Sequence, residues 1–297
     1  MSTEHPPPQP VQLTAADGYR LAALHYPAVG AAQARLFVAG ATGVAQRFYA
    51  PFASFAASQG IDVWTLDYRG VGLSRPPDLR ALQMHYIDWA RLDLPALLDH
   101  VEARGQGPIW MVGHSYGGHA LGLMHGNARV QRMATFATGA GWHGWMPPLE
   151  RARVMLLWHV IGPALVRSTG FLAWSRLGLG EDLPRDLFFQ WRRWCQWPRY
   201  FFEDPDLPGL AEEFARVRTP IRAVNAIDDR WAPPASRDAF MQAYCNAPVE
   251  RVTLDPRSLG MGPIGHVGYF RPRAEALWRE TLEWLRAPMA AKSSNGL

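Results

Sequence analysis

Apolar residues in this chain gather in short runs that alternate with amphipathic stretches. The runs at 34–40, 61–68 and 109–115 are almost continuously apolar, which is typical of strands buried on both faces of a sheet. Between these runs, residues 49–60 and 85–105 carry apolar side chains at helical spacing, and the first stretch stops at a glycine. The alternation predicts an α/β fold, with a mostly parallel sheet flanked by helices.

The same pattern extends toward both ends of the chain. Residues 11–27 alternate around Asp17-Gly18, which predicts a β-hairpin. Pro95 must kink the helix expected at 85–105 or begin its second half. The remaining strands are expected at 132–138, 221–228 and 249–255, and the remaining helices at 116–126, 233–245 and 272–287.

Between residues 140 and 215 this rhythm breaks. The stretch has no clear strand run and holds seven of the 13 tryptophans, at 142, 145, 158, 174, 191, 194 and 197. We expect a helical cap inserted between two strands, with some of its rings lining an apolar pocket. The candidate pocket residues are Trp142, Trp145 and Trp194. A stacking surface for nucleic acid or a membrane interface is a weaker reading, because the chain has no broader basic patch.

These patterns divide the chain into a sheet domain, a cap and two tails. The expected boundaries are 1–10 for a disordered tail, 11–139 and 216–289 for the sheet domain, 140–215 for the cap, and 290–297 for a loose tail. The net charge of +4 comes from scattered arginines. The two cysteines form no disulfide framework, and we see no signal peptide or membrane span. We therefore expect a cytoplasmic protein.

The first candidate for chemistry is the motif GHSYGG at residues 113–118. It lies between a predicted buried strand and a predicted helix, where a G-x-S-x-G motif forms a sharp turn that exposes the serine. Ser115 would project above the N-terminus of the helix, where backbone N–H groups can stabilise an oxyanion. The alternative reading is a glycine-rich turn that only packs the helix closely on the strand.

A nucleophilic serine needs a base and an orienting carboxylate, and the chain supplies both in a suitable order. Asp228 and Asp229 follow the strand expected at 221–228. His266 lies further on, in a glycine-rich loop before the last helix. His114 and His119, beside the serine, are read as packing around the turn. The histidines show no metal-binding spacing, and no cofactor is implied.

At this point the chain resembles the α/β-hydrolase superfamily, and most closely a bacterial branch of uncharacterised predicted serine hydrolases. The resemblance lies in AGATGVAQRFYAPFASFAASQG, LDYRGVGLSRP, GHSYGGHALGL, NAIDDRWAPP and PIGHVGYFR. It implies Ser115 as nucleophile, His266 as general base and acid, and an aspartate of the pair as the orienting member. The spacing of Asp229 to a small residue and a proline favours Asp229, with Asp228 as the alternative acid.

The resemblance also implies an oxyanion hole, whose sequence departs from the pattern of many relatives. Ala39-Gly40 stands where relatives often carry His-Gly. Because the donors are backbone amides, we expect the N–H groups of Ala41 and Tyr116 to form the hole. Asp67 and Arg69, in the stretch DYRGVGLS, are expected to brace the loops near the serine.

The function predicted from the sequence is that of a serine hydrolase acting on an ester, thioester or related acyl compound with an apolar acyl part. An acyltransferase with the same three residues is the alternative within enzymes. A catalytically silent binding protein of the same fold is the alternative from another class. The expected partner is a small acyl substrate, without nucleic acid or stable membrane insertion, and a homodimer is left open.

Overall fold

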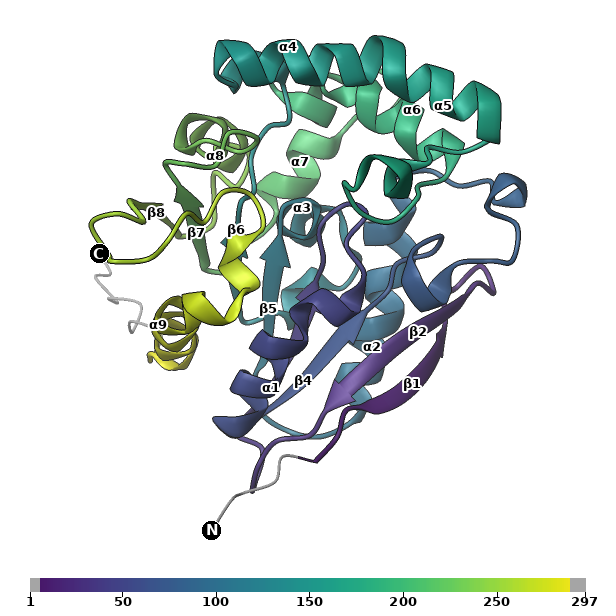
Figure 1. Ribbon diagram of the computed structural model, residues 1–297. Coiled ribbons are helices and arrows are strands. Elements are labelled where there is room, and N and C mark those ends of the chain that lie inside the picture. Colours follow the sequence, from purple (N-terminus) through teal and green to yellow (C-terminus); the bar gives the residue numbers. More distant parts are fainter. Residues whose placement is uncertain (1–5, 289–297) are drawn as a thin grey trace.

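The computed structural model describes residues 6–288, which form one central sheet with helices on both faces (Figure 1). The predicted tail 290–297 lies outside the described residues. The predicted tail 1–10 is too long, because the first strand already begins at Gln9. The eight strands are β1 (Gln9–Thr14), β2 (Arg20–Tyr26), β3 (Ala34–Ala39), β4 (Ile61–Leu66), β5 (Ile109–His114), β6 (Arg132–Phe136), β7 (Ile221–Ala226) and β8 (Val249–Leu254).

The strands follow the order β1-β2-β4-β3-β5-β6-β7-β8 across the sheet. β1 and β2 pair antiparallel, which confirms the hairpin, and β2 also pairs antiparallel with β4. All later neighbours are parallel. The predicted mostly parallel sheet is therefore confirmed, with an antiparallel hairpin at one edge.

Alternate residues of the central strands face two separate apolar layers, because successive side chains of a strand point to opposite faces. Leu36 and Val38 of β3 pack in the layer with α1 (Ala50–Ser58) and α9 (Glu275–Arg286). Phe37 packs in the layer on the opposite face. That second face is covered by α2 (Leu94–Ala103), α3 (Tyr116–Leu123) and α8 (Pro234–Met241).

Two prolines within helical stretches, Pro95 and Pro163, follow π-helical turns. Trp89–Asp93 is a π-helix that leads into α2, where Pro95 is the second residue. Proline cannot donate to the carbonyl four residues earlier and its ring clashes with that carbonyl, and a widened turn relieves both problems. Pro95 thus begins the second half of the helix, as one of the two expected outcomes.

The segment between β6 and β7, residues 137–220, is termed the insertion. Figure 1 shows α4, α5 and α6 gathered at one end of the molecule. The helices of the insertion fall within the predicted 140–215 and include α4 (Pro148–Leu156), α5 (Gly162–Thr169), α6 (Arg185–Trp194) and α7 (Leu210–Ala215). The pairing of Leu172 with Leu183 is an isolated bridge and makes no strand.

Two further features concern the whole described chain. Cys195 is buried and Cys245 is exposed, and both thiols are free. Within residues 6–288, every helix is too short or too polar to cross a membrane.

Candidate active site

Ser115 occupies a sharp turn between β5 and α3, with φ 51° and ψ −111°. A positive φ is strained for a residue with a side chain, and such strain is characteristic of functional sites. The glycines of the motif permit this turn by close packing. A Cβ on Gly117 would lie 1.9 Å from the carbonyl oxygen of Ala39, and one on Gly118 would lie 1.9 Å from Thr138 Oγ1. Gly117 and Gly118 are thus required by the close approach of neighbouring backbone and of a side chain, respectively.

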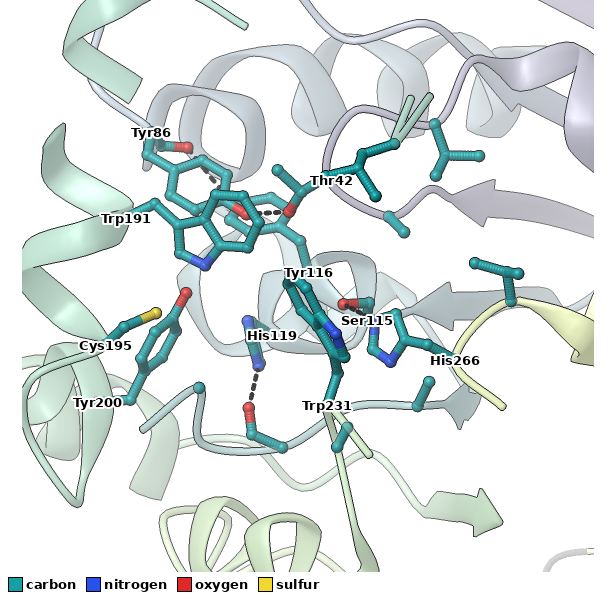
Figure 2. A pocket seen from close by; sticks show the side chains of 18 of the residues that line it. Thr42, Tyr86, Ser115, Tyr116, His119, Trp191, Cys195, Tyr200, Trp231 and His266 are labelled. Atoms are coloured by element: carbon teal, nitrogen blue, oxygen red, sulfur yellow. Dashed lines mark hydrogen bonds between the residues drawn. The ribbon is translucent and has the colours of Figure 1, made fainter. Parts of the chain in front are cut away.

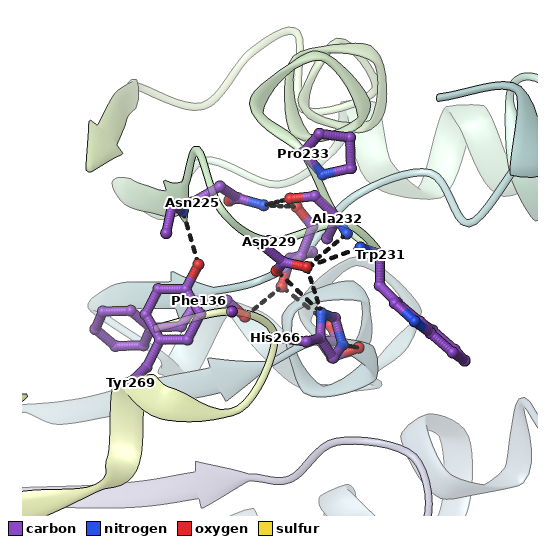
Figure 3. Close-up of polar contacts among 12 residues, drawn as sticks. Phe136, Asn225, Asp229, Trp231, Ala232, Pro233, His266 and Tyr269 are labelled. Atoms are coloured by element: carbon purple, nitrogen blue, oxygen red, sulfur yellow. Dashed lines mark hydrogen bonds and ion pairs between the residues drawn. The ribbon is translucent and has the colours of Figure 1, made fainter. Parts of the chain in front are cut away.

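The structure brings Ser115, His266 and Asp229 together above the ends of the parallel strands. Ser115 Oγ lies 3.0 Å from His266 Nε2. His266 Nδ1 lies 3.0 and 3.1 Å from the two carboxylate oxygens of Asp229 (Figure 3). The backbone N–H groups of Trp231 and Ala232 donate to Asp229 Oδ1 at 2.9 and 3.0 Å. These contacts hold a carboxylate that is almost fully buried against the histidine.

Asp228 has a different position from its neighbour. Its carboxylate accepts hydrogen bonds from the backbone N–H groups of Ile264, at 2.9 Å, and Gly265, at 3.1 Å. It therefore braces the loop immediately before His266. The structure separates the two aspartates that the sequence left as alternatives: Asp229 contacts the imidazole, and Asp228 holds the loop.

A buried relay connects the loop after β3 to the loop of His266. Burial is the main cause that lowers the pKa of His114 to about 3, so this ring is neutral. His114 Nε2 lies 2.8 Å from the carbonyl oxygen of His266 and must carry the proton. His114 Nδ1 then accepts from the Tyr49 hydroxyl at 2.9 Å. The Tyr49 oxygen in turn accepts from the backbone N–H of Ala41 at 2.7 Å.

This relay corrects one predicted oxyanion donor. The N–H of Ala41 is already occupied by Tyr49, so it is not available to a substrate oxygen. The N–H of the next residue, Thr42, has no acceptor among the described residues, and Thr42 lines the same cavity as Ser115. Tyr116 is the first residue of α3, so its N–H lacks an intrahelical acceptor. No local sequence pattern indicates the Tyr49 contact, which occupies the N–H of Ala41 and leaves that of Thr42 free among the described residues.

The stretch DYRG braces this end of the sheet, as expected. Asp67 accepts from the backbone N–H groups of Gln46, at 2.7 Å, and Leu73, at 2.9 Å. Arg69 forms ion pairs with Asp93, at 2.7 Å, and Asp17, at 2.6 Å. These bonds tie the loop after β4 to the loop after β3, to the hairpin and to the helix start.

A cavity of about 220 Å³ lies over Ser115 and His266 (Figure 2). Its wall is rich in aromatic side chains, and the rings come from both the sheet domain and the insertion. Glu150 of α4 accepts a hydrogen bond from Trp231 Nε1 at 2.9 Å, which fixes one of these rings to the insertion. The large aromatic residues of the wall are Tyr86, Tyr116, Trp158, Trp174, Trp191, Tyr200 and Trp231.

The predicted pocket residues Trp142, Trp145 and Trp194 are wrong, because none of them lines this cavity. Trp194 is fully buried and donates its Nε1–H to Asp204 at 2.8 Å, away from the cavity. Trp142 and Trp145 pack edge-on against each other. The residues that do line the cavity depend on how the insertion folds back, which its composition does not encode. Trp231 could have been found, since it follows Asp229 by two residues.

Two more features concern the chemistry of this cavity. Ser115, Ala137 and Tyr200 are the residues other than glycine with positive φ in the described chain, and all three line the cavity. Strain is thus concentrated around one site. Among residues 6–288, no cluster of three His, Cys, Asp or Glu side chains could hold a metal ion.

Comparisons with known proteins agree with this architecture. A family model described as "Alpha/beta hydrolase family" matches residues 36–276. A search of the curated proteins found no match. Similar solved structures include a soluble variant of monoglyceride lipase from Saccharomyces cerevisiae, with a TM-score of 0.65, 14% identity, and coverage of 96% of this chain and 97% of that one.

Two further solved structures have a similar fold. The esterase domain of a Rhodothermus marinus protein has a TM-score of 0.57 and 18% identity, with coverage of 95% of this chain and 98% of that one. A hydrolase from Pseudomonas aeruginosa has a TM-score of 0.59 and 20% identity, with coverage of 94% and 99%. At these identities the likeness concerns the fold alone.

Proposed function

The chain belongs to the alpha/beta hydrolase family, and from this premise we propose that it is a serine hydrolase for an ester, thioester or related acyl compound with an apolar acyl part. The observation that carries the proposal is the unbroken series of contacts from Asp229 through His266 to Ser115, at 3.0 Å for each step. The series ends at the floor of an aromatic cavity. A glycine-rich turn that served packing alone would not need a histidine and a buried carboxylate aligned behind its serine.

In the proposed reaction, Ser115 Oγ attacks the substrate carbonyl carbon while His266 Nε2 takes the hydroxyl proton. Asp229 keeps the proton of Nδ1 in place and stabilises the imidazolium that forms. The tetrahedral intermediate collapses when His266 gives its proton to the leaving group, which departs. Water, activated by the same imidazole, then attacks the acyl-enzyme and releases the acid.

The negative oxygen of each tetrahedral intermediate needs donors that are already in place. We assign this role to the backbone N–H groups of Tyr116 and Thr42. The Thr42 hydroxyl is hydrogen-bonded to the Tyr86 hydroxyl, and the N–H of the preceding residue is bonded to Tyr49. Both bonds support an oxyanion loop that keeps its position when no substrate is bound.

The insertion would act as a lid that selects the acyl group. Support comes from its contribution to the cavity, since Trp158, Trp174 and Trp191 all come from the insertion. Rings from a segment without catalytic groups suit recognition of an apolar chain, because apolar and aromatic side chains dominate small-molecule sites.

A fluorophosphonate probe tests this proposal directly. The purified protein is expected to be labelled covalently, and labelling should disappear in Ser115→Ala and fall by roughly 10³-fold or more in His266→Ala. Folding of each variant is checked by circular dichroism. Labelling that persists without Ser115 would contradict the assignment of the nucleophile.

Two outcomes would favour the other functions. A folded wild-type protein that is not labelled and cleaves no ester would indicate a binding protein that lacks the reaction. Product analysis with a simple alcohol present separates hydrolysis from acyl transfer, since a transferase would form a new ester in preference to the free acid.

A further inference from the structure

The end of the cavity opposite His266 carries polar groups that the proposed mechanism does not use. Figure 2 shows Ser115 between His266 on one side and His119, Tyr200 and Trp191 on the other. The Tyr200 hydroxyl and the Trp191 ring nitrogen point into the space between these side chains. No hydrogen bond joins either atom to the other cavity residues drawn in Figure 2. An otherwise apolar cavity thus has a polar end.

His119 contributes an acceptor to this polar end. Its Nε2 lies 2.9 Å from the carbonyl oxygen of Gly139, so this nitrogen must carry the ring proton. Burial is the main cause that lowers the pKa of His119 to about 4, so the ring is neutral near pH 7. Its Nδ1 therefore keeps a free lone pair. This nitrogen is buried and has no hydrogen-bond partner among the described residues, and His119 as a whole is only 5% exposed.

Tyr200 contributes a hydroxyl, which can both donate and accept. Its backbone has a φ of 58°, which is strained for a tyrosine and aims the ring at the cavity. The ring lies 5.2 Å from that of His119 between centroids. It also packs closely on Gly141, where a Cβ would come within 2.9 Å of the tyrosine Cε2. A strained residue that is held this tightly has a fixed hydroxyl position.

The polar end is neutral. The residues that line the cavity include no Arg, Lys, Asp or Glu side chain. A carboxylate, phosphate or ammonium group would lose its hydration there without gaining an opposite charge, which is strongly unfavourable. A hydroxyl suits these groups, because it can donate to His119 Nδ1 and accept from Tyr200 or Trp191.

The place of the polar end in the cavity indicates which side of the scissile bond it faces. His266 must reach the leaving group to protonate it, so the leaving group lies on the His266 side of Ser115. The acyl chain then extends to the opposite side, toward His119 and Tyr200. The cavity volume of about 220 Å³ is below the ~300–1,000 Å³ of sites for drug-sized ligands, which indicates a short chain.

We infer that the polar end is a subsite for a hydroxyl group on a short acyl chain, and that the preferred substrate is a hydroxyacyl ester or thioester. His119 Nδ1 accepts a hydrogen bond from this hydroxyl, and the Tyr200 hydroxyl donates one to it. The inference rests on the proposed function and adds the class of acyl group. A site built to hydrogen-bond a substrate hydroxyl discriminates strongly against the analogue that lacks it, because its own polar groups then stay unpaired.

Matched ethyl esters test the inference, with acid release measured by titration at constant pH. Ethyl hexanoate is compared with ethyl 3-hydroxyhexanoate and ethyl 6-hydroxyhexanoate. We expect at least one hydroxyacyl ester to exceed ethyl hexanoate in kcat/KM by roughly 10-fold or more. Tyr200→Phe, which removes only the hydroxyl, should reduce this ratio by roughly 10-fold, and His119→Leu should reduce it as well.

The matched control is Tyr244→Phe, which also removes a buried tyrosine hydroxyl but lies outside the cavity. It should leave the ratio unchanged. 2-Hydroxyethyl hexanoate carries the hydroxyl on the alcohol side instead, and a preference for this ester alone would overturn the acyl-side subsite. Thermal unfolding of each variant shows whether a lost preference reflects a lost fold.

Failure of the inference differs from failure of the proposed function. If wild-type protein cleaves ethyl hexanoate in a Ser115-dependent way but shows no preference for a hydroxyacyl ester, the subsite is overturned and the hydrolase stands. If no ester is cleaved and the fluorophosphonate does not label the protein, both are overturned.

Discussion

The wall of the cavity that the sheet domain supplies is held by hydrogen bonds, whereas the wall that the insertion supplies is held by ring contacts. On the sheet side, Asp229, His266 and Ser115 form one series, and a second relay ties His114 to the oxyanion loop. On the insertion side, Trp191 stacks on Trp174 at 5.2 Å between centroids and meets Trp158 edge-on. The hydrogen bonds of the sheet wall hold individual atoms in position, whereas the ring contacts of the insertion wall determine the shape of the cavity.

This difference separates two kinds of effect. Hydrogen bonds are directional and lose their value within a fraction of an ångström, so the sheet wall suits steps that need a set geometry. Ring packing tolerates small shifts and is specific mainly in volume and contour. Changes in the series Asp229-His266-Ser115 should therefore lower the rate for every substrate alike, and changes in the insertion wall should alter the choice among substrates.

The largest effect is expected from Asp229→Asn, which keeps the size of the side chain but removes its charge. The imidazolium then loses its stabilising partner and the histidine can adopt the wrong tautomer, so kcat/KM should fall by roughly 10⁴-fold for all esters. Asp228→Asn is the matched control, because it lies next in the chain and binds only the loop. A fall of roughly 10-fold is expected there, and equal losses would contradict the assignment.

The buried histidines of the sheet wall predict how stability changes with pH. The pKa of His119 falls from its ordinary 6.5 to about 4 on folding, so the unfolded chain binds a proton between these values that the folded protein does not. The contribution of this group is therefore lost as pH falls below 6.5. As the pH falls from 6.5 toward 4, the free energy of unfolding of wild type relative to His119→Leu should decrease by up to about 1.4 kcal/mol for each pH unit.

Denaturant unfolding at pH 7, 6 and 5 measures this difference. The comparison with a variant is needed because burial raises the pKa of Asp93 to about 7, and a carboxyl with a raised pKa acts in the opposite direction. His85→Leu, at an exposed position, controls for the loss of a histidine. Parallel pH curves for wild type and His119→Leu would mean that folding does not lower the pKa of His119.

In the insertion wall, Trp191→Ala should change selection. The ring lines the cavity, and its removal opens space that a longer acyl chain can fill. We expect the ratio of kcat/KM for octanoyl over butanoyl esters to rise by roughly 10-fold. Trp145→Ala, in the insertion but outside the cavity, should leave the ratio unchanged. If Trp191→Ala lowers kcat/KM for both esters by the same factor, the insertion wall does not select among acyl chains.

The smallest effect is expected from Tyr49→Phe, which breaks the relay from Ala41 to His114. The oxyanion loop loses one anchor, so kcat should fall by roughly 3- to 10-fold for short and long esters alike. Tyr244→Phe is again the control, since Tyr244 also accepts from a buried backbone N–H, that of Gly122 at 3.1 Å. Both variants should lose about 1–3 kcal/mol of stability, and only Tyr49→Phe should lose rate.

The same division explains what could be predicted from the sequence. The sheet and the positions of Ser115, Asp229 and His266 follow from local patterns, because each residue lies in a segment that follows a strand and parallel strands end at one edge. The pair Asp228-Asp229 remained open, since neighbouring residues differ only in the direction of their side chains. The choice of the Ala41 N–H as an oxyanion donor was wrong, because a contact eight positions away occupies it.

The insertion wall could not be predicted in the same way. Trp191 and Trp194 are three residues apart on α6, and both belong to its buried face. Their different surroundings depend on Asp204, which binds one ring and leaves the other at the cavity. A hydrophobic pattern indicates that a ring is buried, but it does not identify which neighbour covers it.

The tryptophans around the cavity have one practical consequence. Trp191 lies 4.6 Å from Trp158, 5.2 Å from Trp174 and 6.3 Å from Trp231 between ring centroids, and Trp231 lies 6.0 Å from the imidazole of His266. Indoles this close share their excited states. Occupancy of the site should therefore register in the intrinsic fluorescence and near-ultraviolet dichroism of the protein, so that a native optical signal can report ligand entry without an added dye.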